Sequence, residues 1–149
     1  MIYKVRRSRV VPYFVGGLCA VHVGDVVVGI LSALERGKTG ERYILGGENL
    51  TYQQLVRLSA AAFGLKRRFV PAWPVVTAAA RFLVPGFSYA RHYMGSRFQF
   101  YASEKAQRAL GYRPRPFAAI LDECLRFAGL PRNGPSASPN PIFQAADTP

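Results

Sequence analysis

Apolar residues recur along this 149-residue chain in short runs that predict strands. Four such runs are bounded by glycine, proline or charged residues, as short strands in a folded domain are. They are Val10–Val15, Cys19–Val23, Arg42–Leu45 and Lys66–Pro71.

Between these runs the apolar spacing changes to that of amphipathic helices. Asp25 can cap the first helix, because a carboxylate at this place accepts the free amides of the first turn. Gly37 is placed to end that helix. One apolar face is expected from Val27, Ile30, Leu31 and Leu34.

The clearest helix start is the stretch L-T-Y-Q-Q-L. Thr51 and Gln54 have the spacing of a capping box, and Leu50 and Leu55 are placed for a hydrophobic staple. Gly64 is expected to end this helix. Its predicted buried face consists of Leu55, Leu58, Ser59, Ala62 and Phe63.

Three later helices are expected at Trp73–Val84, Ser103–Gly111 and Pro116–Gly129. Ser103 is interpreted as a cap, and a proline suits a first turn. The alternation of strands and helices predicts an α/β fold. One face of the last helix is expected to be lined by Phe117, Ile120, Leu121, Cys124 and Ala128.

The chain is expected to divide into three parts. Residues 1–9 are interpreted as the remnant of a preceding element, 10–130 as one folded region and 131–149 as a disordered tail. No secretory signal is recognised, and the apolar stretch 69–87 is interrupted by prolines and Arg81. We therefore expect a cytoplasmic protein without a transmembrane segment.

Composition adds an electrostatic question. With 20 Lys+Arg against 8 Asp+Glu, the formal net charge is +12, which suits partners such as nucleic acid or an anionic surface. The charges are scattered, and no run reaches the length of a nucleic-acid-binding tail. Cys19 and Cys124 lie in apolar runs and fit no metal spacing, so both are expected to be buried, reduced thiols.

Three motifs, in this order, resemble the extended short-chain dehydrogenase/reductases, also called NAD-dependent epimerase/dehydratases. They are V-H-V-G-D-V at 21–26, A-L-E-R-G-K-T-G-E-R-Y-I-L-G-G-E-N-L-T at 33–51 and S-E-K-A-Q-R-A-L-G-Y-R-P-R-P at 103–116. Within that family the chain is similar to hopanoid-associated sugar epimerases and dihydroflavonol-reductase-like proteins. The resemblance covers about residues 5 to 130.

The resemblance implies the C-terminal, substrate-binding portion of a Rossmann-type fold, with the N-terminal nucleotide-binding half missing. It also implies NAD or NADP as the family's cofactor. No G-x-x-G-x-x-G follows an opening strand, so no cofactor-binding residue is assigned in this chain. Tyr101 and Lys105 have the Y-x-x-x-K spacing of the family's catalytic pair. They fall in a late structural element, where Ser103 would leave Tyr101 outside the helix, so no catalytic residue is assigned either.

His22 has two open interpretations. The resemblance places this strand end near the substrate cleft, whereas a histidine here can also hold a backbone hydrogen bond that organises the turn. The family usually has two adjacent acids after the V-H-V motif. Gly24 replaces the first of them, which weakens any carboxylate role at Asp25.

The best substrate-binding candidates lie in the aromatic and basic segment around residue 91. Arg91 and His92 are followed by Arg97, a weaker candidate because G-S-R-F-Q departs from the family pattern. Guanidinium groups bind phosphate in a bidentate manner, and aromatic rings stack on sugars or bases. Tyr13 is a further candidate that could wall the same pocket, and a solvated basic loop is the alternative.

Two classes of function remain open from the sequence. The first is the substrate-binding part of an NAD(P)-dependent sugar epimerase or reductase. This chain alone would be inactive, either as a truncated reading frame or as half of a split enzyme whose N-terminal half is missing. Its substrate would be a nucleotide sugar or a similar small carbonyl or alcohol compound. The second is a basic binding module for nucleic acid or an anionic surface, although no specific nucleic-acid motif is present.

Overall fold

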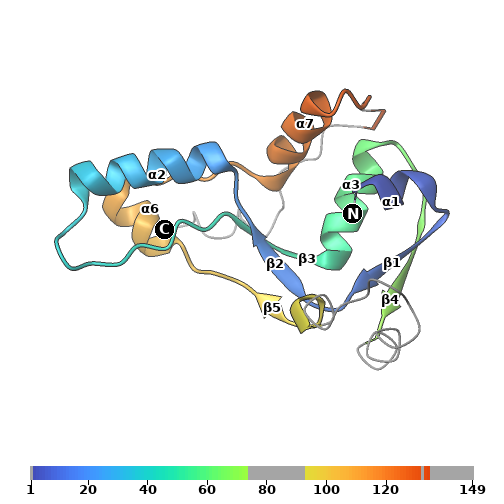
Figure 1. Cartoon of the computed structure of the whole chain (residues 1–149), viewed down its shortest axis with the longest axis horizontal. Coiled ribbons are helices and arrows are strands. Elements are labelled where there is room, and N and C mark those ends of the chain that lie inside the picture. Colours follow the sequence, from blue (N-terminus) through green and yellow to red (C-terminus); the bar gives the residue numbers. More distant parts are fainter. Residues whose placement is uncertain (1, 74–92, 132, 135–149) are drawn as a thin grey trace, which may run out of the picture.

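The computed structural model describes residues 2–73, 93–131 and 133–134, and it is a mixed α/β structure (Figure 1). The α/β class predicted from the alternation of apolar spacings is therefore confirmed. The predicted helix at 73–84 falls almost entirely outside the described residues. Among the residues that are described, no helix is long and apolar enough to cross a bilayer.

Two small sheets organise the molecule. Strand β1 (Val10–Phe14) pairs in parallel with β4 (Arg68–Ala72), and Val11 lies opposite Phe69. In the second sheet, β2 (Gly17–Ala20) lies between β3 (Glu48–Thr51), which is antiparallel to it, and the short parallel strand β5 (Phe98–Gln99).

The chain passes from the first sheet to the second through a glycine pair. The backbone amides of Gly16 and Gly17 donate to the carbonyls of Gly95 and Arg97, at 2.9 and 3.0 Å. A Cβ atom on Gly16 would lie 2.2 Å from the Arg97 carbonyl oxygen, so a larger residue does not fit there. This contact fixes residues 95–97 against the end of β1.

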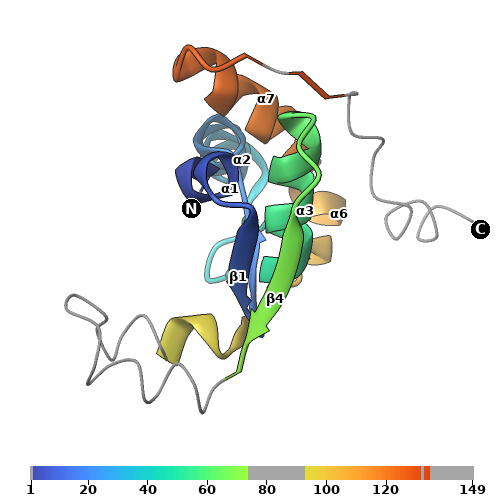
Figure 2. The same ribbon diagram turned by 90° about the vertical axis from the view of Figure 1, so that its right-hand side faces the viewer.

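Helix α3 (Tyr52–Ala62) lies along the β1–β4 pair, with α1 (Ile2–Arg7) beside it (Figure 2). The predicted capping box is confirmed: Thr51 Oγ1 accepts from the Gln54 amide at 3.1 Å, and Gln54 Oε1 accepts from the Thr51 amide at 2.8 Å. The core between these elements contains Val5, Val11, Val56 and Ala60.

The predicted buried face of α3 is partly wrong in phase. Ser59, Ala62 and Phe63 are buried as expected, but Leu55 and Leu58 are only half-buried. The helix presents Val56 and Ala60 to the sheet instead, because it packs on two sides, against β1 and against α7.

The remaining helices are α2 (Val23–Arg36), α6 (Glu104–Leu110) and α7 (Phe117–Phe127). The ends predicted at Gly37 and Gly111 are confirmed, and Gly111 has a left-handed φ of 69°. Ile120, Leu121 and Leu125 of α7 are buried. Cys124 is exposed, so its predicted burial is wrong, whereas both cysteines are free thiols as expected.

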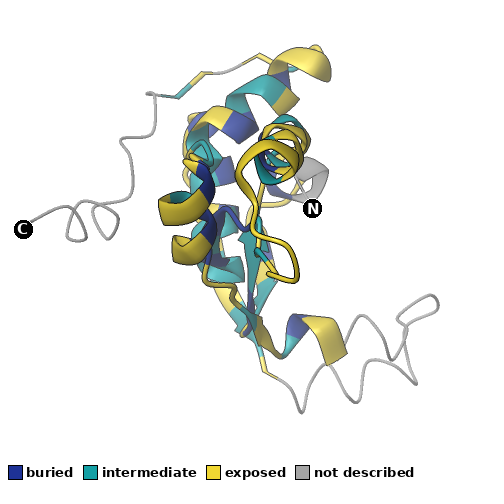
Figure 3. Ribbon diagram, turned by 90° about the vertical axis from the view of Figure 1, so that its left-hand side faces the viewer, coloured by how far each residue is buried: buried dark blue, intermediate teal, exposed yellow. Residues whose placement is uncertain are grey.

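One further prediction is wrong: residues 42–45 form no strand, and β3 begins at Glu48. The apolar residues Val27, Ile30, Leu31 and Leu34 of α2 are exposed, and Figure 3 shows exposed positions on that helix. No element of the described part of the chain covers these side chains.

Candidate functional site

A cavity of about 320 Å³ opens where β1 and β4 end. Ligands of parallel α/β sheets bind at the carboxyl ends of the strands, so this position favours a binding site. The volume is at the lower end of the range for small-molecule sites. The cavity is lined by Tyr13, Phe14, Val15, Thr51, Gln53, Pro71 and Trp73.

Aromatic side chains form much of its wall. The Phe14 ring packs edge to face on Tyr52, with centroids 5.9 Å apart, and burial raises the pKa of Tyr52. Trp73, the chain's single tryptophan, is exposed over 62% of its surface and lies at the rim. Such a wall suits the flat face of a base or sugar ring.

The polar groups of the cavity differ in availability. The Thr51 hydroxyl is engaged in the capping box, where it also contacts Gln54 Oε1 at 3.0 Å. The carboxamide of Gln53 has no hydrogen-bond partner within the described part of the chain. Gln53 can therefore both donate to and accept from a ligand, which a hydroxyl- or carbonyl-bearing molecule requires.

The substrate-binding residues predicted from sequence have different outcomes. Tyr13 lines the cavity. Arg97 is exposed and lies over the Tyr93 ring, with its Cζ atom 4.5 Å from the ring centroid; its side chain does not line the cavity. Arg91 and His92 lie outside the described residues, between Trp73 and Tyr93, so their predicted role stays a prediction.

His22 is placed at the start of α2 and away from this cavity. Its Nδ1 accepts from the Gly24 amide at 3.0 Å and caps the helix, while Nε2 lies 3.3 Å from Glu123 Oε1. Both ring nitrogens are therefore occupied, as the turn-organising interpretation requires. The neutral tautomer with hydrogen on Nε2 satisfies both contacts.

Asp25 is not the helix cap, which corrects the sequence-based interpretation. Its carboxylate is buried and accepts from the Arg115 backbone amide and from Arg115 Nε, both at 2.9 Å. Arg115 Nη1 continues to Glu123 at 3.0 Å. The carboxylate is used to fasten α2 to the segment before α7, because a buried charge needs a paired partner.

The Y-x-x-x-K spacing does not form a catalytic pair. Tyr101 precedes α6, as predicted from the position of Ser103, although no side-chain hydrogen bond of Ser103 caps the helix. The Lys105 ammonium pairs with Glu41 and lies 5.1 Å from the Tyr43 ring centroid. The Lys105 side chain is thus directed to the 41–43 segment.

Sequence reasoning missed Gln53 and Trp73 as cavity residues. Gln53 lies between Thr51 and Gln54, and the sequence pattern of the capping box assigned a role only to those two residues. Trp73 was assigned to a helix start, whereas it directly follows β4. Trp73 follows β4, and its link to Tyr13 required the β1–β4 pairing, which joins residues almost sixty positions apart. Gln53 lies in the first turn of α3, and its link required the packing of that helix against β1.

A dinucleotide does not fit the junctions that lead into α2 and α3. A pyrophosphate needs free amides at a helix start. The first turn of α2 contains the His22 ring and the Asp25 carboxylate, and that of α3 is closed by Thr51. The described residues also contain no group of three side chains that could hold a metal ion.

Comparisons with known proteins match the chain to parts of longer proteins. No protein-family profile matches the chain. Over 85 residues, or 53% of its length, the chain is 36% identical to a Synechocystis protein with the provisional name dihydroflavonol 4-reductase. It spans only 25% of that relative.

Solved structures with the same fold are also much longer than this chain. The crystal structure of gox2253 matches with a TM-score of 0.62 and 32% identity, over 87% of this chain and 43% of that chain. A Staphylococcus aureus nucleoside-diphosphate-sugar epimerase has a TM-score of 0.59 at 16% identity, with coverages of 80% and 46%. RMD from Pseudomonas aeruginosa, solved with NADPH, has a TM-score of 0.51 at 15% identity, with coverages of 84% and 36%.

Proposed function

This chain is related to the epimerase- and reductase-type short-chain dehydrogenase/reductases, and from that premise we propose that it supplies a substrate-binding part of such an enzyme. The proposed ligand is a nucleotide sugar or a similar small carbonyl or alcohol compound. The observation that carries the proposal is the aromatic cavity at the carboxyl ends of β1 and β4.

In this proposal each cavity residue has a physical task. The Tyr13 and Trp73 rings contact the flat faces of the ligand and exclude water from them. The Gln53 carboxamide, which has no partner among the described residues, hydrogen-bonds a ligand hydroxyl or carbonyl and fixes its orientation. Arg91 and His92, which border the described segment at Tyr93, remain proposed contacts to a phosphate group.

We further propose that the 149-residue chain alone performs no hydride transfer. Enzymes of this family take hydride from or give it to NAD or NADP, and the helix starts described above do not fit that dinucleotide. Lys105 is paired with Glu41 and lies over the Tyr43 ring, so its ammonium does not serve as the partner of a catalytic tyrosine at position 101. We propose that an N-terminal half provides both the dinucleotide site and the catalytic tyrosine.

Calorimetry with UDP-glucose tests the binding proposal. The Trp73→Ala variant should weaken binding by about tenfold, which corresponds to one lost aromatic contact of roughly 1–1.5 kcal/mol. Tyr101→Ala is the matched control, since Tyr101 is also an exposed aromatic residue but does not line the cavity. Equal weakening by both variants would contradict the assigned site.

The absence of hydride transfer is tested separately. NADPH absorbance should stay constant when the chain alone is mixed with UDP-glucose or an aromatic ketone. Oxidation of NADPH at a rate proportional to the chain concentration would contradict this part of the proposal and leave the binding site untouched.

A further inference from the structure

Negative charge is absent from one half of the described structure. All aspartate and glutamate residues that the structure describes lie in 25–48 and 104–123, whereas 2–24 and 49–73 contain none. The acid-free segments build α1, β1, β2, α3 and β4, and all of β3 except Glu48. The net charge of +12 is therefore concentrated on this half and is not spread evenly.

This half contains a second, larger hollow of about 750 Å³. It shares no lining residue with the Tyr13 cavity. Its floor is apolar, with Ala60, Ala61, Leu65 and Phe69, and its walls come from the segment before β1, from α3 and from β4. Five cationic residues line it: Arg9, Arg57, Lys66, Arg67 and Arg68.

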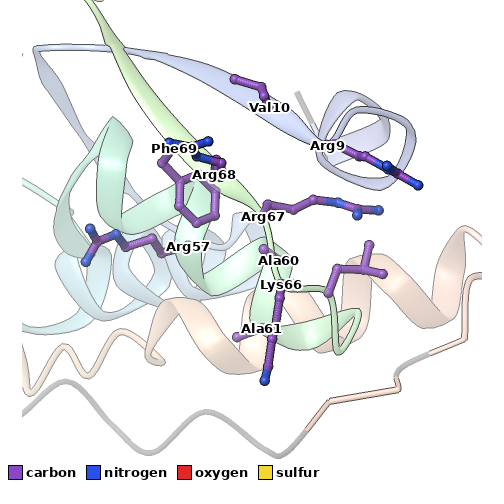
Figure 4. A pocket seen from close by; sticks show the side chains of 10 residues that line it. Arg9, Val10, Arg57, Ala60, Ala61, Lys66, Arg67, Arg68 and Phe69 are labelled. Carbon is purple, nitrogen blue, oxygen red and sulfur yellow. The ribbon is translucent and has the colours of Figure 1, made fainter.

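Figure 4 shows how these cations are placed around α3. Arg57 lies on one side of the Ala60–Ala61 stretch and Arg67 on the other, with Lys66 close to Ala61. Two of them are held in place. Arg67 donates to the carbonyls of Val5 and Arg6 at 3.2 and 3.1 Å, and the Arg57 guanidinium lies 6.0 Å from the Phe69 ring centroid.

None of the five cations pairs with a carboxylate in the part of the chain that the structure describes. Like charges gathered without counter-charges repel one another, and an anion in their midst removes that cost. Arginine matches the geometry of phosphate oxygens, because its N–H groups form a planar fork. The volume corresponds to a small molecule and not to an extended polymer.

We propose that this hollow binds a small ligand that carries two or more phosphate groups. The apolar floor contacts the body of the ligand, and the surrounding cations neutralise its phosphates. The phosphate chemistry is shared by soluble diphosphates and by the headgroups of anionic lipids, and the experiment separates these two sources.

The test uses the full 149-residue chain and inorganic pyrophosphate as the probe, with calorimetry at two salt concentrations. The variant Arg57→Gln/Lys66→Gln removes two exposed cations from the hollow and leaves Arg67 with its structural hydrogen bonds. The matched control is Arg108→Gln/Arg126→Gln, which removes the same charge from exposed positions of α6 and α7. Circular dichroism melting verifies that both variants remain folded.

The expected result is that the hollow variant weakens pyrophosphate binding by about tenfold or more and the control by less than about twofold. Equal weakening in both variants, or no binding by the unchanged chain, would overturn the proposal. Competition arms with cardiolipin-containing vesicles, whose headgroup carries two phosphates, and with ADP then identify the source, because the true source displaces pyrophosphate. Displacement by a 20-nucleotide single-stranded DNA but by neither small phosphate source would overturn the small-ligand assignment.

Discussion

Helices α2 and α3 have similar apolar periodicity but differ in the burial of their apolar side chains. Helix α3 buries Val56 and Ala60 against β1. At its C-terminal end, Phe63 is buried against α7. Helix α2 directs its larger apolar side chains to solvent, and Leu34 is exposed over 80% of its surface. The spacing of apolar residues therefore predicts that a helix has an apolar face, but not that the described part of the chain covers that face.

The covered side of α2 is the one that carries the small residues Gly29 and Ala33, called its small side below. A Cβ atom on Gly29 would lie 2.7 Å from the Leu45 side chain, and Ala33 packs with the Tyr112 cluster. The start of the helix is fastened by polar contacts of His22 and Asp25. Helix α3 is thus held by hydrophobic burial, whereas α2 is held by close packing and by charged hydrogen bonds at one end.

The largest effect is expected from the core beneath α3. Phe63→Ala should lower the free energy of unfolding by about 3–5 kcal/mol, because it removes a buried ring and leaves a cavity. Urea denaturation measures this change. Phe127→Ala is the control, since Phe127 is exposed over 95% of its surface and should cost less than about 0.5 kcal/mol.

A smaller but clear effect is expected at the polar attachment of α2. Arg115→Ala should cost about 1.5–3 kcal/mol, because the buried Asp25 carboxylate loses a charged hydrogen-bond partner. Arg113→Ala removes the same charge from an exposed position nearby. If the two variants have the same unfolding free energy, the polar attachment contributes nothing to holding α2.

The capping box of α3 is expected to contribute about 1 kcal/mol. Thr51→Ala removes the oxygen that accepts from the Gln54 amide, and urea denaturation should report a loss of this size. Thr39→Ala, in an exposed turn, is the matched control. An unchanged midpoint for Thr51→Ala would show that water replaces the cap without cost.

A pH dependence is expected from the residue that packs against the small side of α2. Burial raises the pKa of Tyr112, with smaller contributions from Asp25 and Cys19. The folded state thus keeps the proton to higher pH than the unfolded state, and stability should fall as pH rises from about 10 through the folded-state pKa. Tyr112→Phe should flatten this fall in thermal melts and change stability little at pH 7, because the buried hydroxyl has no partner among the described residues.

The smallest effect is expected on the exposed face of α2. Leu31→Gln and Leu34→Gln should each change the unfolding free energy by less than about 0.5 kcal/mol. A loss above about 2 kcal/mol in either variant would mean that something covers this face in solution, and the contrast with α3 would disappear.

These contrasts indicate which parts of the structure were available from the sequence. Local signals such as the Thr51–Gln54 box, Gly37 and Gly111 predicted helix ends correctly, because caps depend on a few neighbouring residues. The strand expected at 42–45 failed because its apolar residues serve another purpose: Leu45 packs against Gly29 of α2. Local composition cannot distinguish a strand from an extended segment that packs on a helix.

The candidate site was predictable only in part. Tyr13 was identified as a possible wall residue, whereas Trp73 joins it through the long-range pairing of β1 with β4 and Gln53 through the packing of α3 against β1. Asp25 was misassigned because a carboxylate in a first helical turn normally caps. Here His22 caps, and the Arg115 partner is ninety residues away.

The measurement that tests the central claim most directly is the fluorescence of Trp73, the single tryptophan of the chain, during titration with UDP-glucose. Emission should change in a saturable way with the nucleotide sugar and not with inorganic pyrophosphate. The reason is that Trp73 lines the strand-end cavity and not the cationic hollow. Emission that stays constant while calorimetry detects UDP-glucose binding would contradict the assignment of this cavity as the substrate site.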